Sequence, residues 1–165
     1  MDAKRLFDAH TYFCNLCKSN RLTEQYGFHP CTVSGIGSLQ EPLQQFRQKT
    51  AFLAVDDTND AAIVQQAGGF FKKRTFTVFL LMRYRMDDMA DRQTKLDICR
   101  NIFLQLISRM IIDKEDLSNE LVYLNTARIM SRELGTYFMS GCTGLYFMTD
   151  VLEPVDVSYN EEEWK

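Results

Sequence analysis

The chain has 165 residues, a length typical of one domain and sufficient to bury a core without disulfides or metals. Its hydrophobic fraction of 45% and charged fraction of 25% exclude a low-complexity disordered chain. The formal net charge of −3 argues against nucleic acid as a direct partner, because phosphate binding requires a basic surface.

The first 48 residues predict a helix, a short strand and a second, shorter helix. Apolar positions recur at helical spacing over 4–26, and Gly27 has no Cβ, so a helix ends there readily. A short extended piece follows at 28–33. Pro42 then falls in the first turn of a short helix over 39–48, where its missing N–H does no harm.

Three strands are predicted next. A short apolar run at 50–56 indicates a buried strand, and a second strand follows a polar turn at 61–67. The clearest strand pattern spans 70–86, where one face is wholly apolar and the other is mixed. The basic run 72–74 (Lys-Lys-Arg) lies within it, and we interpret this run as a solvated strand end.

One long amphipathic helix is predicted in the middle of the chain. Apolar residues recur at three- and four-residue steps over 87–112 and form a single stripe, which additional isoleucines widen. Acidic residues open this helix and Arg109 lies near its end, as the helix dipole favours. Residues 113–120 are polar and predict a turn.

The last part of the chain predicts further strands. A strand pattern covers 121–134, and a long strand or strand pair covers 135–152. Glycines at 141 and 144 indicate a bulge, a bend or a tight turn. The remaining residues, 153–165, form an acidic tail that holds the only tryptophan.

The order of these elements predicts the fold class. A helix, several strands, a long helix and more strands argue for α+β rather than alternating α/β architecture. We expect a mixed or antiparallel sheet packed against one long central helix, with an additional N-terminal helix. Neither a repeat nor a linker is visible, so 1–165 is expected to be a single domain with its core at 50–152.

Cysteine usage and hydropathy predict the compartment. The number of cysteines is odd, and no apolar stretch near the N-terminus has the length of a signal-peptide core. No apolar run approaches the roughly 20 residues that a membrane helix needs. We therefore expect a cytoplasmic protein with reduced thiols and no membrane partner. The five cysteines are Cys14, Cys17, Cys31, Cys99 and Cys142.

A histidine–cysteine cluster offers the strongest alternative chemistry. His10, Cys14 and Cys17, followed by His29 and Cys31, have donor atoms that bind zinc. The first three lie on the apolar stripe of the predicted N-terminal helix, however, and free cysteine behaves as a small hydrophobe. A Cys-x2-Cys pair within a helix also lacks the tight turn of most structural zinc sites. We therefore predict core packing, with no metal and no cofactor.

Other patterns that carry chemistry are weak in this sequence. Asp56, Asp57 and Asp60 supply oxygen ligands for a hard cation, but they lack the spaced loop of a calcium site, so a solvated turn is favoured. The glycine pairs at 35–37 and 68–69 lack a phosphate-loop lysine. No context around the two histidines supports a nucleophile triad, so we predict that the protein is not an enzyme.

Two features predict contact surfaces for other subunits. The mixed face of strand 70–86 carries Phe79 and Leu81, which are expected to leave apolar surface for a neighbour. Tyr159 and Trp164 near the chain end are costly to leave in water, so they are expected to dock. Docking on the chain's own sheet and docking on a neighbouring subunit are both open at this stage.

The C-terminal residues resemble a known group of proteins. The glycine–aromatic segment 144–151, followed by Pro-Val-Asp at 154–156, Tyr-Asn at 159–160 and Trp164, resembles small prophage structural proteins of Bacteroides-like bacteria. The layout of a long strand, an amphipathic helix and paired strands over 50–152 is similar to that of tail-terminator and head–tail joining proteins of long-tailed phages.

This resemblance implies a function without catalysis or cofactor. It implies a homo-oligomeric subunit, in the form of a ring, that caps or joins the tail tube and contacts other virion tail or neck proteins. The alternative is a small cytoplasmic binding or adaptor module of unrelated role, which would be a stable monomer with a groove for its partner.

Overall fold

The computed structural model describes residues 6–135 and 141–165. The helices are α1 Ala9–Ser19, α2 Arg21–Gln25, α3 Gln40–Gln45 and α4 Met89–Asn119. The strands are β1 Phe28–Val33, β2 Ala51–Asp56, β3 Asp60–Gln66, β4 Gly69–Arg83, β5 Tyr123–Leu124, β6 Met130–Glu133 and β7 Cys142–Pro154. Short 3-10 turns lie at Ile36–Ser38 and Glu161–Glu163.

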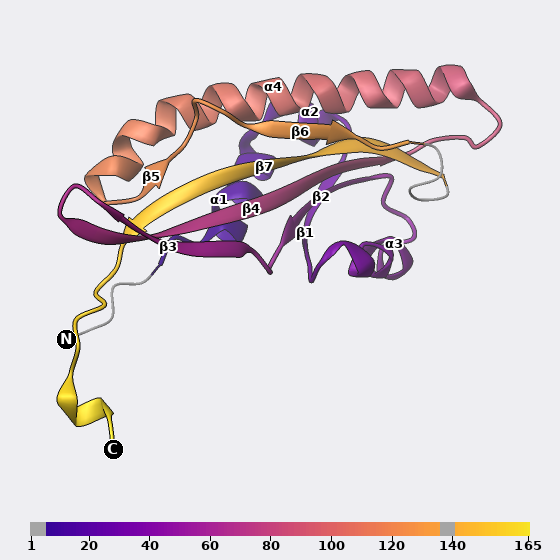
Figure 1. Cartoon of the computed structure of the whole chain (residues 1–165). Helices are drawn as coiled ribbons and strands as arrows, with labels where there is room; N and C mark the ends of the chain where they lie inside the picture. Colours follow the sequence, from indigo (N-terminus) through magenta and orange to yellow (C-terminus); the bar gives the residue numbers. More distant parts are fainter. Residues whose placement is uncertain (1–5, 136–140) are drawn as a thin grey trace.

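The strands form one mixed sheet of seven strands in the order β1-β2-β4-β7-β5. β3 pairs with β4, and β6 pairs with β7. β1 and β2 are parallel, and every other pairing is antiparallel. The long strands β4 and β7 pair from Phe71–Pro154 to Arg83–Cys142 and form the spine of the sheet (Figure 1). The predicted α+β class with a mixed sheet and one long helix is confirmed.

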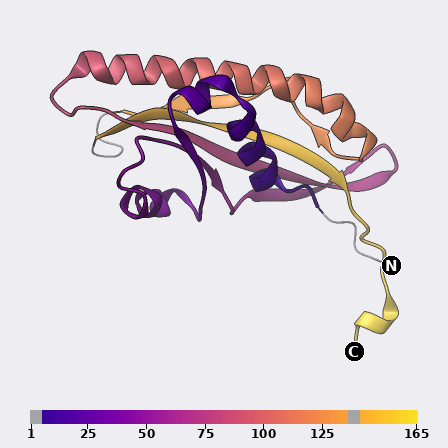
Figure 2. The same ribbon diagram turned by 180° about the vertical axis from the view of Figure 1, so that it is seen from behind.

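α1 and α4 cover one face of the sheet, and the larger core cluster lies beneath them (Figure 2). Phe13 of α1 and Phe103 of α4 both contact the ring of Phe147 on β7, with centroids 5.8 and 5.1 Å apart. Alternate residues of β4, among them Val78 and Leu80, face the same cluster and are fully buried. Each such side chain contributes about 1.5–3 kcal/mol by leaving water.

A second, smaller core lies on the opposite face. Phe79 and Leu81 are 0% and 1% exposed there, packed with Phe52 of β2 and with Leu43 of α3. The prediction that Phe79 and Leu81 leave apolar surface for a neighbour is therefore wrong. α3, the loop before it and Leu134 cover this end of the face, and strand alternation alone does not reveal such a cover.

The N-terminal helix is divided in two. Residues 4 and 5 of the predicted helix lie outside the described residues. Asp8 caps α1 by accepting a hydrogen bond from the backbone N–H of Thr11 at 3.0 Å. Asn20 is extended and caps α2, because its side-chain oxygen accepts from Leu22 N and Thr23 N. The chain therefore turns at Asn20 instead of continuing as one helix.

α4 is longer than the sequence pattern predicted. It begins at Met89, is capped by the side chain of Asp88, and continues to Asn119, so the predicted turn over 113–120 is wrong. Asp113 forms an ion pair with Arg109 one turn earlier, and Leu117 packs against the main core, so the polar end is held in the helix. Within the described residues, no helix is both long and apolar enough to cross a membrane.

The strands after α4 differ in their bounds from the prediction. The region 121–134 holds two short strands, β5 and β6, instead of one. Residues 136–140 of the predicted strand 135–152 lie outside the described residues. Gly144 lies inside β7, opposite Leu81, and does not interrupt the strand. The predictions for 28–33, 50–56, 61–67 and 70–86 are confirmed within a few residues.

Candidate functional site

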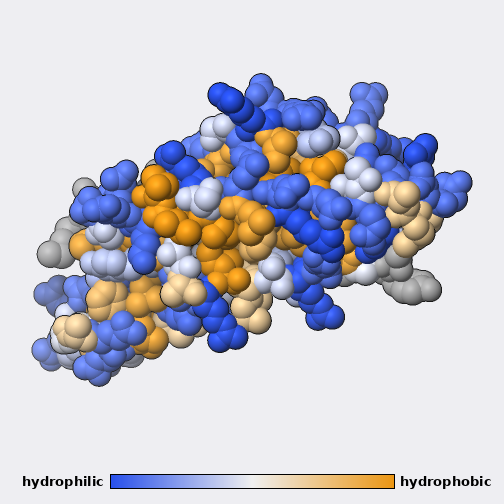
Figure 3. Space-filling model, turned by 90° about the horizontal axis from the view of Figure 1, so that it is seen from above, coloured by the Kyte–Doolittle hydropathy of each residue, from blue (hydrophilic) through white to orange (hydrophobic). Residues whose placement is uncertain are grey.

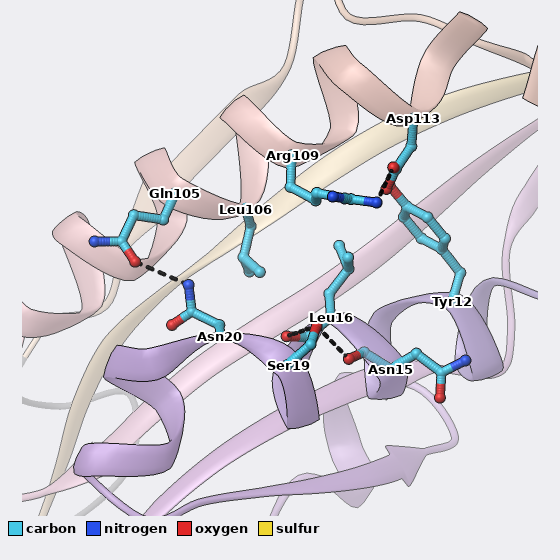
Figure 4. A pocket seen from close by; sticks show the side chains of 9 residues that line it. All are labelled: Tyr12, Asn15, Leu16, Ser19, Asn20, Gln105, Leu106, Arg109 and Asp113. Atoms are coloured by element: carbon cyan, nitrogen blue, oxygen red, sulfur yellow. Dashed lines mark hydrogen bonds and ion pairs between the residues drawn. The ribbon is translucent and has the colours of Figure 1, made fainter. Parts of the chain in front are cut away.

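A pocket of about 480 Å³ lies between α1 and α4 (Figure 4). Tyr12 donates a hydrogen bond from its hydroxyl to Asp113 Oδ2 at 3.0 Å, and Arg109 forms an ion pair with Asp113 Oδ1 at 2.8 Å. Asn20 Nδ2 donates to Gln105 Oε1 at 2.8 Å on the other side. These contacts join the two helices. Leu16, Ser19, Asn15 and Leu106 complete the lining.

The ionisable groups of this pocket bind one another through a hydrogen bond and an ion pair. Burial and the nearby Asp113 carboxylate raise the pKa of Tyr12, so its phenol stays protonated through the neutral range. Asp113 is held by both Tyr12 and Arg109, and no histidine or cysteine lines the pocket. We therefore assign these residues to the packing of α1 on α4.

The histidine–cysteine cluster is only partly assembled. Cys14 Sγ lies 3.7 Å from both ring nitrogens of His10, and Thr32 Oγ1 lies 2.6 Å from His10 Nδ1. Cys17 Sγ donates instead to the carbonyl oxygen of Phe28 at 3.8 Å. His29 stands against the ring of Phe46, with centroids 4.2 Å apart. His10 and Cys14 are thus in contact, and Cys31 lies near Cys14 and Cys17, which both add to the effect of burial in raising the pKa of its thiol.

The thiols of this cluster are poorly suited to bind a metal. Burial raises the pKa of Cys17 to about 11 and that of Cys31 to about 12, and it also raises the pKa of Cys14. A metal binds the thiolate, so each raised pKa opposes binding near neutral pH. Among residues 6–135 and 141–165, no three histidine, cysteine, aspartate or glutamate side chains are placed to hold an ion together.

The aspartates after β2 organise a turn. Asp56 is buried, and its Oδ1 accepts hydrogen bonds from Gly35 N and Thr58 N, both at 2.9 Å, and from Thr58 Oγ1 at 2.7 Å. Asp57 and Asp60 are exposed. Asp56 therefore fixes the loop between β2 and β3, as expected for turn chemistry.

A buried ion pair at the base of the C-terminal tail was not predicted. Arg74 and Glu153 are 8% and 1% exposed and are paired directly. The backbone of Phe7 joins them, because its N–H donates to Glu153 Oε2 at 2.8 Å and its carbonyl accepts from Arg74 Nη2 at 2.9 Å. The interpretation of run 72–74 as a solvated strand end is therefore wrong for Arg74.

Beyond the Arg74–Glu153 ion pair, which we call the clamp, the C-terminal tail projects away from the sheet (Figure 1). The last backbone hydrogen bond from the tail to the sheet among the described residues is from Val155 N to Phe70 O, at 3.0 Å. Tyr159 and Trp164 stack on each other with centroids 6.2 Å apart, yet remain 74% and 69% exposed. The alternative that these two rings dock on the chain's own sheet is therefore contradicted.

A second apolar surface lies on the outer side of α4. Leu104, Ile111 and Ile112 are each more than half exposed, and Figure 3 shows apolar side chains gathered over this helix. Ser108 lies between them at helical spacing. We call Leu104, Ser108, Ile111 and Ile112 the α4 patch. Contiguous exposed apolar surface of this kind marks interaction sites.

Comparison with known proteins adds no functional residue. No family model matches this sequence, and no curated protein matches it. The exposed aromatic pair of the tail and the α4 patch are therefore the candidate functional surfaces of this chain.

Proposed function

We propose that this protein is a structural subunit that assembles with copies of itself through its C-terminal tail. The observation that carries the proposal is the exposed, stacked pair Tyr159–Trp164 at the end of a projecting segment. In its narrower form, the proposal is a tail-terminator or head–tail joining subunit of a phage or prophage virion. The resemblance of residues 144–164 to prophage structural proteins supports this narrower form.

The tail is suited to bind a neighbouring subunit. Burying a large aromatic side chain contributes about 1.5–3 kcal/mol, and neither ring receives this within its own chain. Tyrosine and tryptophan are enriched at protein interfaces and among the residues that dominate binding energy. Because the two rings already stack, less side-chain entropy is lost when they dock.

The positions of the surfaces favour contacts that repeat head to tail. The tail leaves from the end of β7, whereas the α4 patch lies on the outer side of another element. A contact between two different surfaces of identical subunits closes into a ring or continues as a filament. A ring is the arrangement that capping or joining a tail tube requires.

A second candidate function uses the surface of α4 and the pocket beside it. The α4 patch and the pocket beside α1 also suit a cytoplasmic binding or adaptor module that takes a different protein as its partner. This alternative predicts a monomer whose tail docks on that partner. The two candidates therefore differ in the mass of the isolated protein.

Replacing both Tyr159 and Trp164 with alanine is expected to reduce assembly without unfolding the subunit. The rings contact each other and not the core, so the double variant should keep the circular-dichroism spectrum and the cooperative thermal transition of the wild type, while the weight-average mass in sedimentation falls towards that of a monomer. Ile36→Ala is the matched control, because Ile36 is also an exposed apolar residue.

Two results would count against this role of the tail. An unchanged mass in the double variant would show that the rings do not hold subunits together. Loss of the cooperative thermal transition in the double variant would show that the tail belongs to the core of its own chain.

A further inference from the structure

The outer edge of β3 lacks the features that usually protect an edge strand. Within the described part of the chain, β3 pairs only with β4, so its other edge is free. Natural edge strands avoid unwanted pairing with charges, prolines or bulges. β1, which ends the same side of the sheet beyond β2, has Pro30 at its centre. β3 has no proline and a single charged residue, Asp60, at its first position.

The side chains of β3 are also available. Six of its seven residues are exposed, and Ile63 is among them although it is a large apolar residue. The strand therefore offers both unpaired backbone groups and apolar side chains to an added strand. Peptides bind in this way when they extend a sheet at an open edge.

The tail has the sequence pattern of a strand without a strand partner. Val155, Val157 and Tyr159 alternate with Asp156 and Ser158, the period of two that characterises a strand with one covered face. After Val155, the segment has no ladder with any described strand. The alternation is therefore unexplained by the contacts of the segment within its own chain.

We propose that residues 155–159 of one copy pair as an additional strand with the outer edge of β3 in a second copy. This inference rests on the proposed self-assembly and names its contact surface. Charge supports the pairing: Asp156 and the glutamates at 161–163 make the tail acidic, whereas Lys72 and Lys73 lie on β4 directly beside Ile63 and Ala62 of β3.

The position of the tail favours exchange between copies. The tail leaves the sheet beside Phe70, at the tip of the β3–β4 hairpin, on the β7 side of β4. β3 lies on the opposite side of β4, and the tail points away from both strands in Figure 1. The donor segment and the acceptor edge are different surfaces, so the contact adds subunits head to tail.

Disulfide formation between two singly substituted proteins tests the pairing. Val157→Cys protein is mixed in separate experiments with Ala61→Cys and Ala62→Cys protein, oxidised, and analysed for the mixed dimer by peptide mass spectrometry. Neighbouring strand residues face opposite sides of a sheet, so one partner should cross-link at least five-fold more than the other. Gln48→Cys, an exposed position in the loop between α3 and β2, is the control and should remain at background.

The outcomes separate this inference from the proposed function. A mixed dimer with the expected alternation supports strand pairing. Equal cross-linking at all three positions, or none at either β3 position in a protein that light scattering shows to be oligomeric, overturns the assignment to β3 and leaves self-assembly standing. A protein that is monomeric at every concentration overturns both. Cross-links within monomers of a Val157→Cys, Ala62→Cys double variant also overturn exchange between copies.

Discussion

Replacing Gly144 with alanine is expected to lower the free energy of unfolding by about 4 kcal/mol. Gly144 has φ = +145°, a conformation that side chains with a Cβ rarely adopt. A Cβ placed there would lie 1.8 Å from the carbonyl oxygen of Leu80, in the partner strand β4. The Cβ is fixed to the backbone of β7 and the oxygen belongs to the backbone of β4, so neither moves aside without disturbing the pairing of these two strands.

The control for this prediction is Gly37→Ala. A Cβ at Gly37 meets nothing within 4 Å, so the expected change is below about 1 kcal/mol. Denaturant unfolding of both variants measures the difference. A Gly144→Ala protein as stable as the wild type would mean that β7 does not approach β4 as closely as described.

Replacing Glu153 with alanine is expected to cost about 3–5 kcal/mol of stability. The substitution leaves the Arg74 guanidinium buried without its carboxylate partner, and it removes the acceptor for Phe7 N. Arg74 also stands 4.8 Å from the ring centroid of Phe76, so its side chain has little room to reach water. Thermal and denaturant unfolding at neutral pH measure the loss.

A double variant distinguishes loss of charge pairing from loss of packing. Arg74→Met combined with Glu153→Leu replaces the pair with apolar side chains of similar size, which is often nearly neutral for stability. We expect it to recover most of the stability that Glu153→Ala loses. Equal destabilisation of the double and single variants would show that shape, rather than an unpaired buried charge, is what the clamp supplies.

Much of the fold is predictable because its hydrophobic periodicity is strong. The alternation over 70–86 and the stripe over 87–112 predicted β4 and α4. The same alternation places Arg74 on the apolar face with Phe76 and Val78, so a signal for the buried ion pair was present. The two lysines that precede this position, Lys72 and Lys73, favoured the solvated interpretation instead.

Other features depend on contacts that no local pattern contains. Phe79 and Leu81 lie on the mixed face of β4, and only the fold shows that α3 and Leu134 cover them. The end of α4 is polar and resembles a turn, and it remains helical because Tyr12 and Arg109 hold Asp113 while Leu117 reaches the core.

Of the candidate assembly surfaces, one is visible in the sequence and the other only in the fold. Tyr159 and Trp164 are conspicuous in the sequence, because aromatic residues beside a run of glutamates at a chain end suggest docking. The free edge of β3 is not visible in the sequence. It follows only from the pairing of the strands, because β4 pairs with one edge of β3 and no described strand pairs with the other.

Light scattering of the full chain across a dilution series tests self-assembly most directly, with a chain ending at Pro154 measured beside it. The full chain should have a discrete mass that is a multiple of 19.2 kDa and persists on dilution, and the shortened chain should be a folded monomer. A full chain with the mass of one subunit at every concentration would contradict the proposed function.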